Sequence, residues 1–483
     1  MSEGRLVRGA HVLTAAEPGE LTDAAVRVVG DRIAAIGSYD DLRRAHPDDE
    51  VTGGPHDLVT PGFVNTHGHF SETLITGIAE QHTLWEWVHA VINPVNPHLT
   101  DEMAYVGSTL GAIQMLRSGI TVANDMFVCD PVAGPVTPGV VRALDEVGLR
   151  GVVSFGASDL GEASVEQVMD EHEALRAAAE ASRLSTFRVG ISAVGAQTPA
   201  MLDRSVELAL GCGCGVHTHL QEIREEVTEI HRLYGATPIA HCEHIGLFQA
   251  PTIAAHCVWV DAADREILAA NGVGVAHNPV SNMILASGVC PVPELRRLGV
   301  PVGIGVDGPA SNDSQNFLEC LKSAILMQRL DQLQATAFSA REAFAMATID
   351  GARSLRLDHE VGSIEVGKAA DLVVFDGDHP AMANVHDPYQ KIAYCSSPDT
   401  VRDVWVAGRR SVEDGRVVTV DVARTVDRSR ELSRDLVTAA GLGRYSLLAD
   451  PVLADAVGID GRVDPADLDP LDARHTTPLE ELT

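Results

Sequence analysis

Short alternating segments lie at both ends of the chain, and a different pattern fills its middle. Residues 5–15, 24–37 and 50–60 alternate apolar and polar positions, are rich in β-branched side chains and are separated by turn residues. This period-two pattern predicts short antiparallel strands. Residues 361–377 and 401–418 return to the same pattern, so we expect both chain ends to pair in one small β-sandwich.

Between residue 61 and about residue 350, apolar runs recur between segments with helical periodicity, such as "DRSVELALG" and "ADREILAAN". The apolar runs cover residues 62–67, 119–127, 150–159, 187–196, 214–220, 252–260, 272–279 and 300–307. Eight strands separated mostly by helices are typical of a parallel barrel. The sequence therefore predicts an α/β fold, a (β/α)8 TIM-type barrel with a small β-sandwich formed by both chain ends.

The changes of pattern divide the chain of 483 residues into four expected parts. We expect residues 1–60 and 361–420 to form the two parts of the sandwich and residues 61–360 to form the barrel. Residues 421–483 begin with a helical pattern and continue as an acidic tail rich in Pro and Asp. Such a composition predicts a loosely ordered segment or an interaction tail.

Composition narrows the class of protein. The formal net charge of −32 argues against a basic face for nucleic acid or for an anionic membrane. No stretch of about 18 apolar residues is present, and the first residues lack the apolar core of a secretory signal. The eight cysteines include no C-x-x-C pair, so we expect reduced thiols in a cytoplasmic protein, with Cys212 and Cys214 packed in a strand.

Histidines and carboxylates follow the ends of several predicted barrel strands. The segment "LVTPGFVNTHGHF", residues 58–70, ends in His67 and His69, which share one side of an extended chain. His217 and His219 end the fifth predicted strand, and His256 and Asp307 lie on the sixth and eighth. The carboxyl ends of barrel strands converge at one mouth, where active sites lie, so we expect these side chains to meet there.

Imidazoles with a carboxylate suit a divalent transition metal, zinc or iron, that keeps an open position for water. Such a metal lowers the pKa of its water and generates a nucleophile. Glu222, three residues after His219, is placed to move protons. Binuclear barrel sites commonly use a bridging lysine, and no lysine precedes Lys322, so one metal per chain is favoured.

The motifs resemble those of the amidohydrolase superfamily, and within it the mononuclear cytosine/guanine deaminase and chlorohydrolase group, which includes triazine hydrolases and 8-oxoguanine deaminases. They are "PGFVNTHGHF", "HTHLQE", "AAHCVWVD", "HNPVSNMILASGVCPVPEL", "GVPVGIGVDGPASND" and "GSIEVGKAADLVVFD". The resemblance implies one divalent metal, zinc before iron, held by His67, His69, His219 and Asp307. It also implies that Asp307 accepts a proton from the attacking water, that Glu222 is the proton shuttle and that His256 orients the water.

The resemblance implies hydrolytic deamination of a small nitrogen heterocycle, purine-, pterin- or triazine-like, by attack of activated water on a ring carbon. Release of chloride or an alkylamine on the same fold is the alternative, and a non-catalytic binding barrel is a remote one. Related nucleoside deaminases carry a Trp-Pro pair and a ribose-binding glutamate where this chain has Asn93 and Asn96, which favours a free base or a triazine.

The partner expected at the mouth is the small heterocyclic substrate, and we expect a homodimer or a higher homo-oligomer. Candidate contacts to the heterocycle are Trp85, Asn278, Ser281, Asn282 and Asn312. Each of the asparagines and Ser281 has an alternative role in fixing its own loop, and the alternative role of Trp85 is packing. Whether His217 contacts the metal or the substrate stays open.

Two other motifs are set aside. "GIGVDG", residues 303–308, matches a dinucleotide fingerprint, but its glycines lie within a predicted strand and do not open a helix. "HCEH", residues 241–244, lacks the partner P-C-x-x-C of the other zinc deaminase fold and reads as a helix end.

Overall fold

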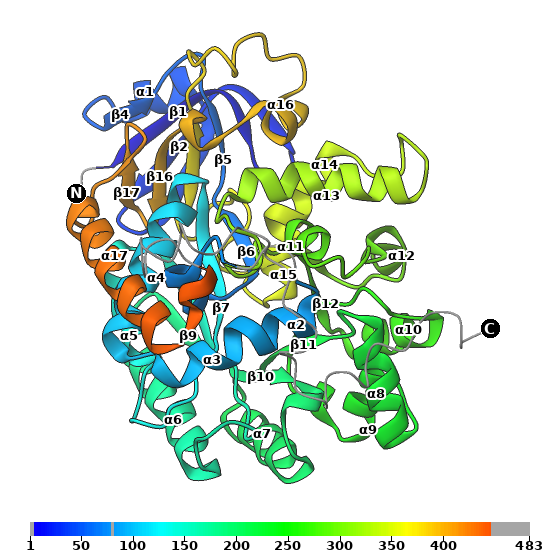
Figure 1. Cartoon of the computed structure of the whole chain (residues 1–483). Helices are drawn as coiled ribbons and strands as arrows, with labels where there is room; N and C mark the ends of the chain where they lie inside the picture. Colours follow the sequence, from blue (N-terminus) through cyan, green and yellow to red (C-terminus); the bar gives the residue numbers. More distant parts are fainter. Residues whose placement is uncertain (1–3, 79–81, 446–483) are drawn as a thin grey trace.

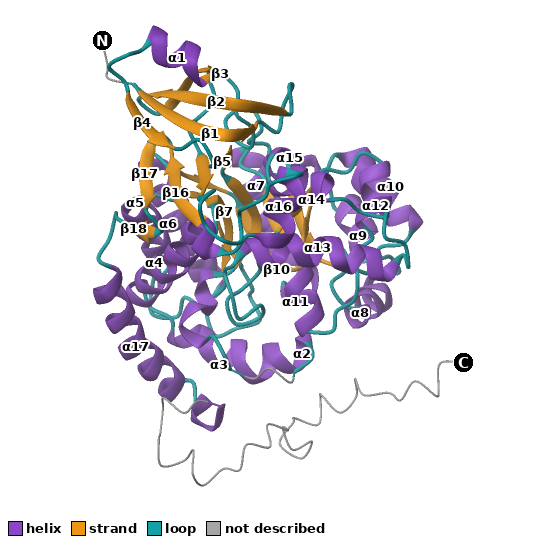
Figure 2. Ribbon diagram, turned by 90° about the horizontal axis from the view of Figure 1, so that it is seen from above, coloured by secondary structure: helices purple, strands orange, loops and turns teal. Residues whose placement is uncertain are grey.

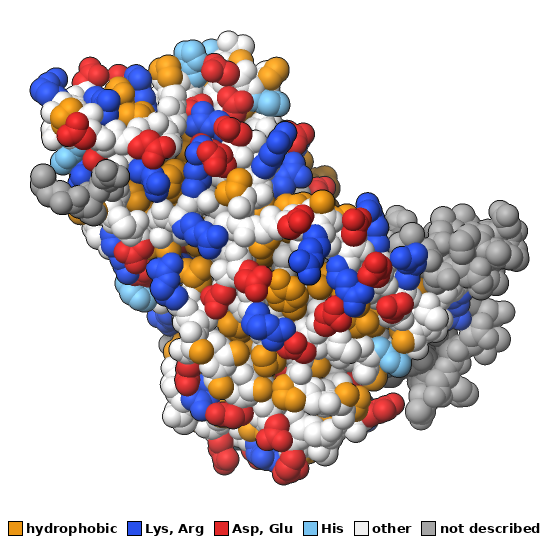
Figure 3. Space-filling model, turned by 90° about the vertical axis from the view of Figure 1, so that its left-hand side faces the viewer, with side chains coloured by type: hydrophobic (Ala, Val, Ile, Leu, Met, Phe, Trp, Pro, Cys, Tyr) orange, Lys and Arg blue, Asp and Glu red, His pale blue; other side chains and the backbone are white. Residues whose placement is uncertain are grey.

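The computed structural model describes residues 4–78 and 82–445. The acidic tail expected after the last helix lies outside these residues. None of the described helices is long and apolar enough to cross a membrane. On the face shown in Figure 3, basic and acidic side chains are interspersed over the surface.

A parallel sheet forms the centre of the molecule (Figure 1). Its strands are β6 (Phe63–Gly68), β7 (Ile120–Phe127), β8 (Arg150–Phe155), β9 (Ser185–Phe187), β10 (Val189–Ala193), β11 (Val216–Leu220), β12 (Thr252–His256), β13 (Gly274–His277) and β14 (Val302–Ile304). Their order is β10-β11-β12-β13-β14-β6-β7-β8-β9. Only Arg188 separates β9 from β10, and a parallel bridge joins Ala157, just after β8, to Ile191 in β10. The sheet therefore closes on itself, and the predicted barrel is confirmed.

Helices surround this sheet. They are α4 (Asp101–Arg117), α5 (Pro138–Val147), α6 (Val165–Ala181), α7 (Pro199–Cys212), α8 (Arg224–Tyr234), α9 (Pro238–His244), α10 (Ala262–Asn271), α11 (Pro279–Ile284), α12 (Val292–Arg297), α13 (Phe317–Asp331), α14 (Ala340–Ala347) and α15 (Ile349–Ser354). Side-chain caps begin some of these helices: Ser164 and Gln167 form a capping box at α6, and Thr198 caps α7.

A second sheet contains strands from both ends of the chain, as the alternating segments predicted (Figure 2). Its strands are β1 (Arg5–Leu13), β2 (Glu20–Val29), β3 (Arg32–Ser38), β4 (Glu50–Gly53), β5 (Leu58–Pro61), β15 (Leu372–Phe375), β16 (Val401–Val406), β17 (Arg409–Glu413) and β18 (Arg416–Val417). The two ends meet where β5 pairs antiparallel with β15. The sheet encloses a small core of its own, in which Trp405 is the largest side chain.

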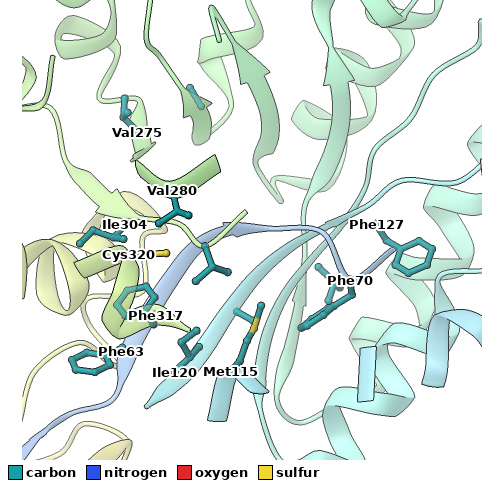
Figure 4. Packing of buried hydrophobic residues seen from close by; sticks show 14 of the residues in the cluster. Phe63, Phe70, Met115, Ile120, Phe127, Val275, Val280, Ile304, Phe317 and Cys320 are labelled. Atoms are coloured by element: carbon teal, nitrogen blue, oxygen red, sulfur yellow. The ribbon is translucent and has the colours of Figure 1, made fainter. Parts of the chain in front are cut away.

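The two sheets are joined at β6, the strand that carries His67. β5 ends at Pro61 and β6 begins at Phe63, with Gly62 between them. A Cβ atom on Gly62 would lie 2.0 Å from Oγ1 of Thr121, so no larger residue fits there. Phe63 stacks on Phe317 with ring centroids 5.4 Å apart (Figure 4), and this apolar packing anchors the start of β6.

The remaining helical segments are α1 (Tyr39–Ala45), η1 (Phe70–Ile75), α2 (Leu84–Trp87), η2 (Val88–Ile92), α3 (Asn93–Val95), η3 (Asn96–His98), η4 (Val194–Ala196), η5 (Leu247–Gln249), α16 (Pro388–Cys395), η6 (Pro398–Thr400), α17 (Val422–Ala439) and η7 (Leu442–Tyr445). The helix α17 runs beside α4 (Figure 1), where Arg428 forms an ion pair with Glu102 at 2.7 Å. The hydroxyl of Ser433 donates to the carbonyl of Leu74 at 2.6 Å. The helix α17 thus packs on η1, the segment that follows His69.

The expectation that all eight cysteines are reduced is wrong. Cys212 and Cys214 form a disulfide at the end of α7 and in the turn before β11, rather than packing within a strand. Gly213 between them adopts a left-handed conformation with φ of 63°, which brings their Cα atoms to 5.3 Å, within reach of a disulfide. The other six cysteines are free thiols, of which only Cys395 is exposed.

Candidate active site

Four histidines and one aspartate meet at the carboxyl ends of the parallel strands. His67 belongs to β6 and His69 follows it, His219 belongs to β11, His256 ends β12, and Asp307 follows β14. The ring centroid of His67 lies 4.6 Å from that of His69, 4.8 Å from that of His219 and 5.4 Å from that of His256. The predicted convergence is therefore present, because parallel strands bring their carboxyl ends to one rim.

Nitrogen and carboxylate atoms crowd together at the centre of this cluster. Nε2 of His69 lies 3.1 Å from Nε2 of His219, and Oδ1 of Asp307 lies 3.1 Å from Nε2 of His67. Nε2 of His67 is buried and has no hydrogen-bond partner in the described part of the chain. Ligand atoms of His67, His69 and Asp307, and of His67, His219 and His256, lie within 4.8 Å of one another. This donor set fits a divalent metal.

Backbone carbonyls set the tautomers of two of these histidines. Nδ1 of His69 donates to the carbonyl of Met126 at 2.6 Å, and Nδ1 of His219 donates to the carbonyl of Ser192. Each ring therefore presents the lone pair of Nε2 to the centre of the cluster. Burial favours the neutral rings, because it lowers the pKa of His69 and His219 and brings the pKa of His67 to about 4.

Asp307 is held in a left-handed backbone conformation with φ of 65°. Its carboxylate accepts hydrogen bonds from the hydroxyl of Ser281 at 2.6 Å and from the backbone N–H of Gly308 at 2.9 Å. Burial opposes its ionisation, but the neighbouring imidazoles outweigh burial and hold the pKa of Asp307 well below its usual range. Asp307 is therefore a carboxylate at the centre of the cluster.

Glu222 and His256 form a buried pair beside Asp307. Oε2 of Glu222 lies 3.4 Å from Nε2 of His256, and Oε1 accepts from the hydroxyl of Ser287 at 2.9 Å. Burial raises the pKa of Glu222. Burial would lower the pKa of His256, but the carboxylates of Glu222 and Asp307 raise it overall. A carboxyl group with a raised pKa next to a cationic imidazole can both store and deliver a proton.

Most of the side chains predicted to contact the substrate form hydrogen bonds within the protein. The hydroxyl of Ser281 binds Asp307, Nδ1 of His256 lies 2.9 Å from Oδ1 of Asn282, and Nδ2 of Asn278 lies 3.3 Å from the His256 ring. The side-chain amide of Asn312 donates to the carbonyl of Val306 at 2.6 Å and thereby binds its own loop. Trp85 is half-buried on α2, with its ring 6.3 Å from that of His89.

His217 contacts His67 on the side of the ring away from Asp307. Its Nε2 is 2.8 Å from Nδ1 of His67, and its Nδ1 is 3.0 Å from the hydroxyl of Ser154. Burial lowers the pKa of His217 well below its usual value, so this ring is neutral. Its nitrogens are thus engaged by His67 and Ser154.

Two buried glutamates that sequence reasoning missed hold the loops of this site. Glu226 accepts from the backbone N–H groups of Gln221 at 3.1 Å and of Glu222 at 3.0 Å, and burial raises its pKa to about 7. In the sequence it looks like an ordinary acidic residue in the first turn of a helix. Glu72 accepts from the backbone N–H groups of Ala310 and Ser311 at 3.1 and 3.2 Å. No sequence pattern indicated it.

Comparison with known proteins assigns the chain to a family. Residues 58–411 match the model of the amidohydrolase family, and residues 24–48 match an imidazolonepropionase-like composite domain of bacteria. A 5'-deoxyadenosine deaminase of Methanopyrus kandleri is 36% identical over 87% of this chain and 96% of its own length. A 5-methylthioadenosine/S-adenosylhomocysteine deaminase of Symbiobacterium thermophilum is 40% identical over 79% of this chain and 87% of its own length.

Solved structures show the same architecture. An adenosine deaminase from Xanthomonas campestris with bound zinc has a TM-score of 0.84 and 28% identity, and the alignment covers 90% of this chain and 99% of the other. An atrazine chlorohydrolase from Arthrobacter aurescens TC1 in complex with zinc has a TM-score of 0.80 and 25% identity, over 89% and 100% of the two chains. Because the family match spans the whole barrel and every strand that carries the clustered histidines, this chain belongs to the amidohydrolase family.

Proposed function

We propose that the chain is a zinc-dependent hydrolytic deaminase with one metal per chain, acting on the adenine ring of a purine nucleoside. The observation that carries this proposal is the group of Glu222, His256 and Asp307 beside the Nε2 atoms of three histidines. The deaminase relatives match this chain over most of its length.

The proposed ligands are Nε2 of His67, His69 and His219 and the carboxylate of Asp307. The buried Nε2 of His67, without a hydrogen-bond partner among residues 4–78 and 82–445, supports this assignment. When bound, a zinc ion would act as a Lewis acid and lower the pKa of water toward neutrality. Iron is the second candidate, because the same nitrogen and oxygen donors suit it.

The side chains around the cluster would then move the protons. Asp307 is a carboxylate within the cluster and accepts a proton from the attacking water. His256 lies between two carboxylates, with Nε2 3.4 Å from Glu222 and 3.7 Å from Asp307. Glu222, whose pKa is raised by burial, delivers protons to the ring nitrogen and to the leaving amine. Water replaces the amino group on the ring carbon, and ammonia leaves.

The named relatives favour a nucleoside as the substrate, rather than the free base or triazine expected from the sequence. Deaminases of 5'-deoxyadenosine and 5-methylthioadenosine/S-adenosylhomocysteine match at 34–40% identity, whereas the triazine-degrading neighbours match at about 25%. Asn93 and Asn96, in the stretch where related nucleoside deaminases carry the ribose-binding glutamate, begin α3 and η3. An amide can also hydrogen-bond to hydroxyl groups, so this replacement is compatible with a nucleoside.

A substrate panel tests the proposal. The zinc-loaded enzyme is assayed with 5'-deoxyadenosine, 5'-methylthioadenosine, S-adenosylhomocysteine, adenosine, adenine, 8-oxoguanine, a pterin and atrazine, and ammonia and chloride release are both measured. We expect the highest kcat/KM for an adenine nucleoside. Chloride release from atrazine without ammonia release from any purine would instead support the chlorohydrolase alternative. A chain that turns over none of these compounds would support the non-catalytic barrel.

The expected homo-oligomer is also part of this proposal. Leu326 and Leu330 lie one turn apart on α13 and are 48% and 75% exposed, and Leu333, just after that helix, is 88% exposed. Exposed apolar side chains on one helix face are typical of a contact between subunits. Light scattering of the purified chain, with Leu330→Glu as the disrupting variant, tests this. A monomeric wild-type chain would contradict it.

A further inference from the structure

His217 forms a hydrogen bond with Nδ1 of His67, whereas Nε2 of His67 faces Asp307. Nε2 of His217 is 2.8 Å from Nδ1 of His67, and both side chains are fully buried. A neutral imidazole carries one proton, so Nε2 of His67 has a free lone pair only when its proton is on Nδ1. The direction of the hydrogen bond between these two histidines therefore decides whether His67 is able to bind a metal through Nε2.

A chain of hydrogen bonds that ends at a backbone carbonyl sets this direction. The hydroxyl of Ser154 lies 2.8 Å from the carbonyl oxygen of Asp125, and a carbonyl oxygen only accepts. Ser154 therefore uses its proton there, and its oxygen accepts from Nδ1–H of His217 at 3.0 Å. Nε2 of His217 is then an acceptor, and His67 donates to it from Nδ1.

Asn124 indicates the same direction independently. Its side-chain nitrogen donates to the carbonyl of Thr66 at 2.6 Å, which fixes the orientation of the amide group. The same nitrogen lies 3.4 Å from Nε2 of His217. An N–H donor at this position requires that Nε2 of His217 be an acceptor.

We propose that His217 is a positioning residue that, together with Ser154, holds the proton of His67 on Nδ1 and keeps Nε2 of His67 available to the metal. This inference rests on the proposed zinc site. His69 and His219 obtain the same tautomer from backbone carbonyls, whereas His67 obtains it from side chains, which substitution can change. Mutation of such hydrogen-bond partners of a metal ligand typically weakens metal affinity by about 10–100-fold.

Zinc affinity of the full-length chain, measured by competition with a chromogenic chelator, tests the role of the acceptor. We expect His217→Phe to weaken zinc binding about 10–100-fold. His217→Gln places an amide oxygen near the position of Nε2, so it should bind zinc almost as wild type does. The matched control is His172→Phe, a buried histidine on α6 outside the cluster, which should leave affinity unchanged. Wild-type affinity in His217→Phe, or equal losses in His217→Phe and His217→Gln, would overturn the proposal.

A double-mutant cycle covers the case in which His217→Phe does not fold. Ser154→Ala should weaken zinc binding when residue 217 is histidine, because the imidazole can then adopt its other tautomer. The same change should have little effect in the His217→Gln background, because an amide oxygen accepts whatever Ser154 does. Equal losses in both backgrounds would refute the relay. Zinc binding by the wild-type chain tests the metal site itself, so the two failures are distinguishable.

Discussion

Oε2 of Glu222 lies 3.4 Å from Nε2 of His256, and both side chains are almost completely buried. The pair is close enough for strong electrostatic coupling in a low-dielectric site. Glu222 is only three residues from His219, yet its carboxylate is directed to His256 and Ser287. The proposed ligand and the proposed proton shuttle are therefore neighbouring residues of one strand end.

The first prediction concerns this division of roles. Glu222→Gln keeps the shape of the side chain but removes the titratable group, so the metal should remain bound while kcat falls by about 10²–10⁴-fold. The exposed neighbour Glu225 supplies the control, and Glu225→Gln should leave kcat unchanged. Steady-state rates and elemental analysis of the same preparations provide the measurement. Loss of metal in Glu222→Gln would make Glu222 a ligand, and an unchanged rate would place the shuttle elsewhere.

The second prediction concerns the metal. We expect close to one zinc or iron per chain, and chelation should abolish turnover. His219→Ala should lose both metal and activity, and Asp307→Asn should bind metal more weakly and turn over slowly. His244→Ala, at the exposed end of α9, is the control and should retain its metal. Elemental analysis decides the count, and two tightly bound ions per chain would contradict the mononuclear site.

The third prediction concerns the turn that carries Glu222. Gln221 has a left-handed conformation with φ of 53°, and Glu226 accepts the backbone N–H groups of Gln221 and Glu222. Glu226→Ala removes both acceptors, so kcat should fall about tenfold or more while zinc content stays constant. Glu229→Ala on the same helix is the control. If Glu226→Ala retains the wild-type kcat, the turn does not depend on this carboxylate.

The fourth prediction concerns stability and pH. Burial lowers the pKa of His172 from 6.5 to about 4, and neither ring nitrogen has a partner among the described residues. Between these pH values the unfolded chain binds a proton that the folded chain does not. The contribution of the neutral ring is therefore present above pH 6.5 and is lost as pH falls toward 4. Protonation of His172 over this pH range should lower the free energy of unfolding by about 3 kcal/mol.

His172→Phe should remove this pH dependence, because phenylalanine does not titrate and can pack against Phe155 and Phe187 as the imidazole does. Urea titrations from about pH 7 to about pH 4.5 measure it. His98→Gln, at an exposed position, should keep the wild-type dependence. If wild type and His172→Phe lose stability in parallel as the pH falls, His172 is not the titrating group.

The pattern of the sequence by itself determined the barrel and the residues that meet at its mouth. Period-two segments at both ends and apolar runs between helices specify which elements form, because side-chain direction follows from local backbone geometry. The same geometry placed His67 and His69 on one side of a strand, and parallel strands bring His219, His256 and Asp307 to the same rim.

Only the tertiary structure decided how these groups are held. The bond between His67 and His217 joins residues 150 positions apart, and Glu72 reaches Ser311 across 239 positions. The disulfide of Cys212 and Cys214 likewise depends on the left-handed turn at Gly213. Periodicity reports which face of its own element a side chain occupies, but the tautomer of an imidazole and the partner of a buried carboxylate depend on atoms brought close by folding.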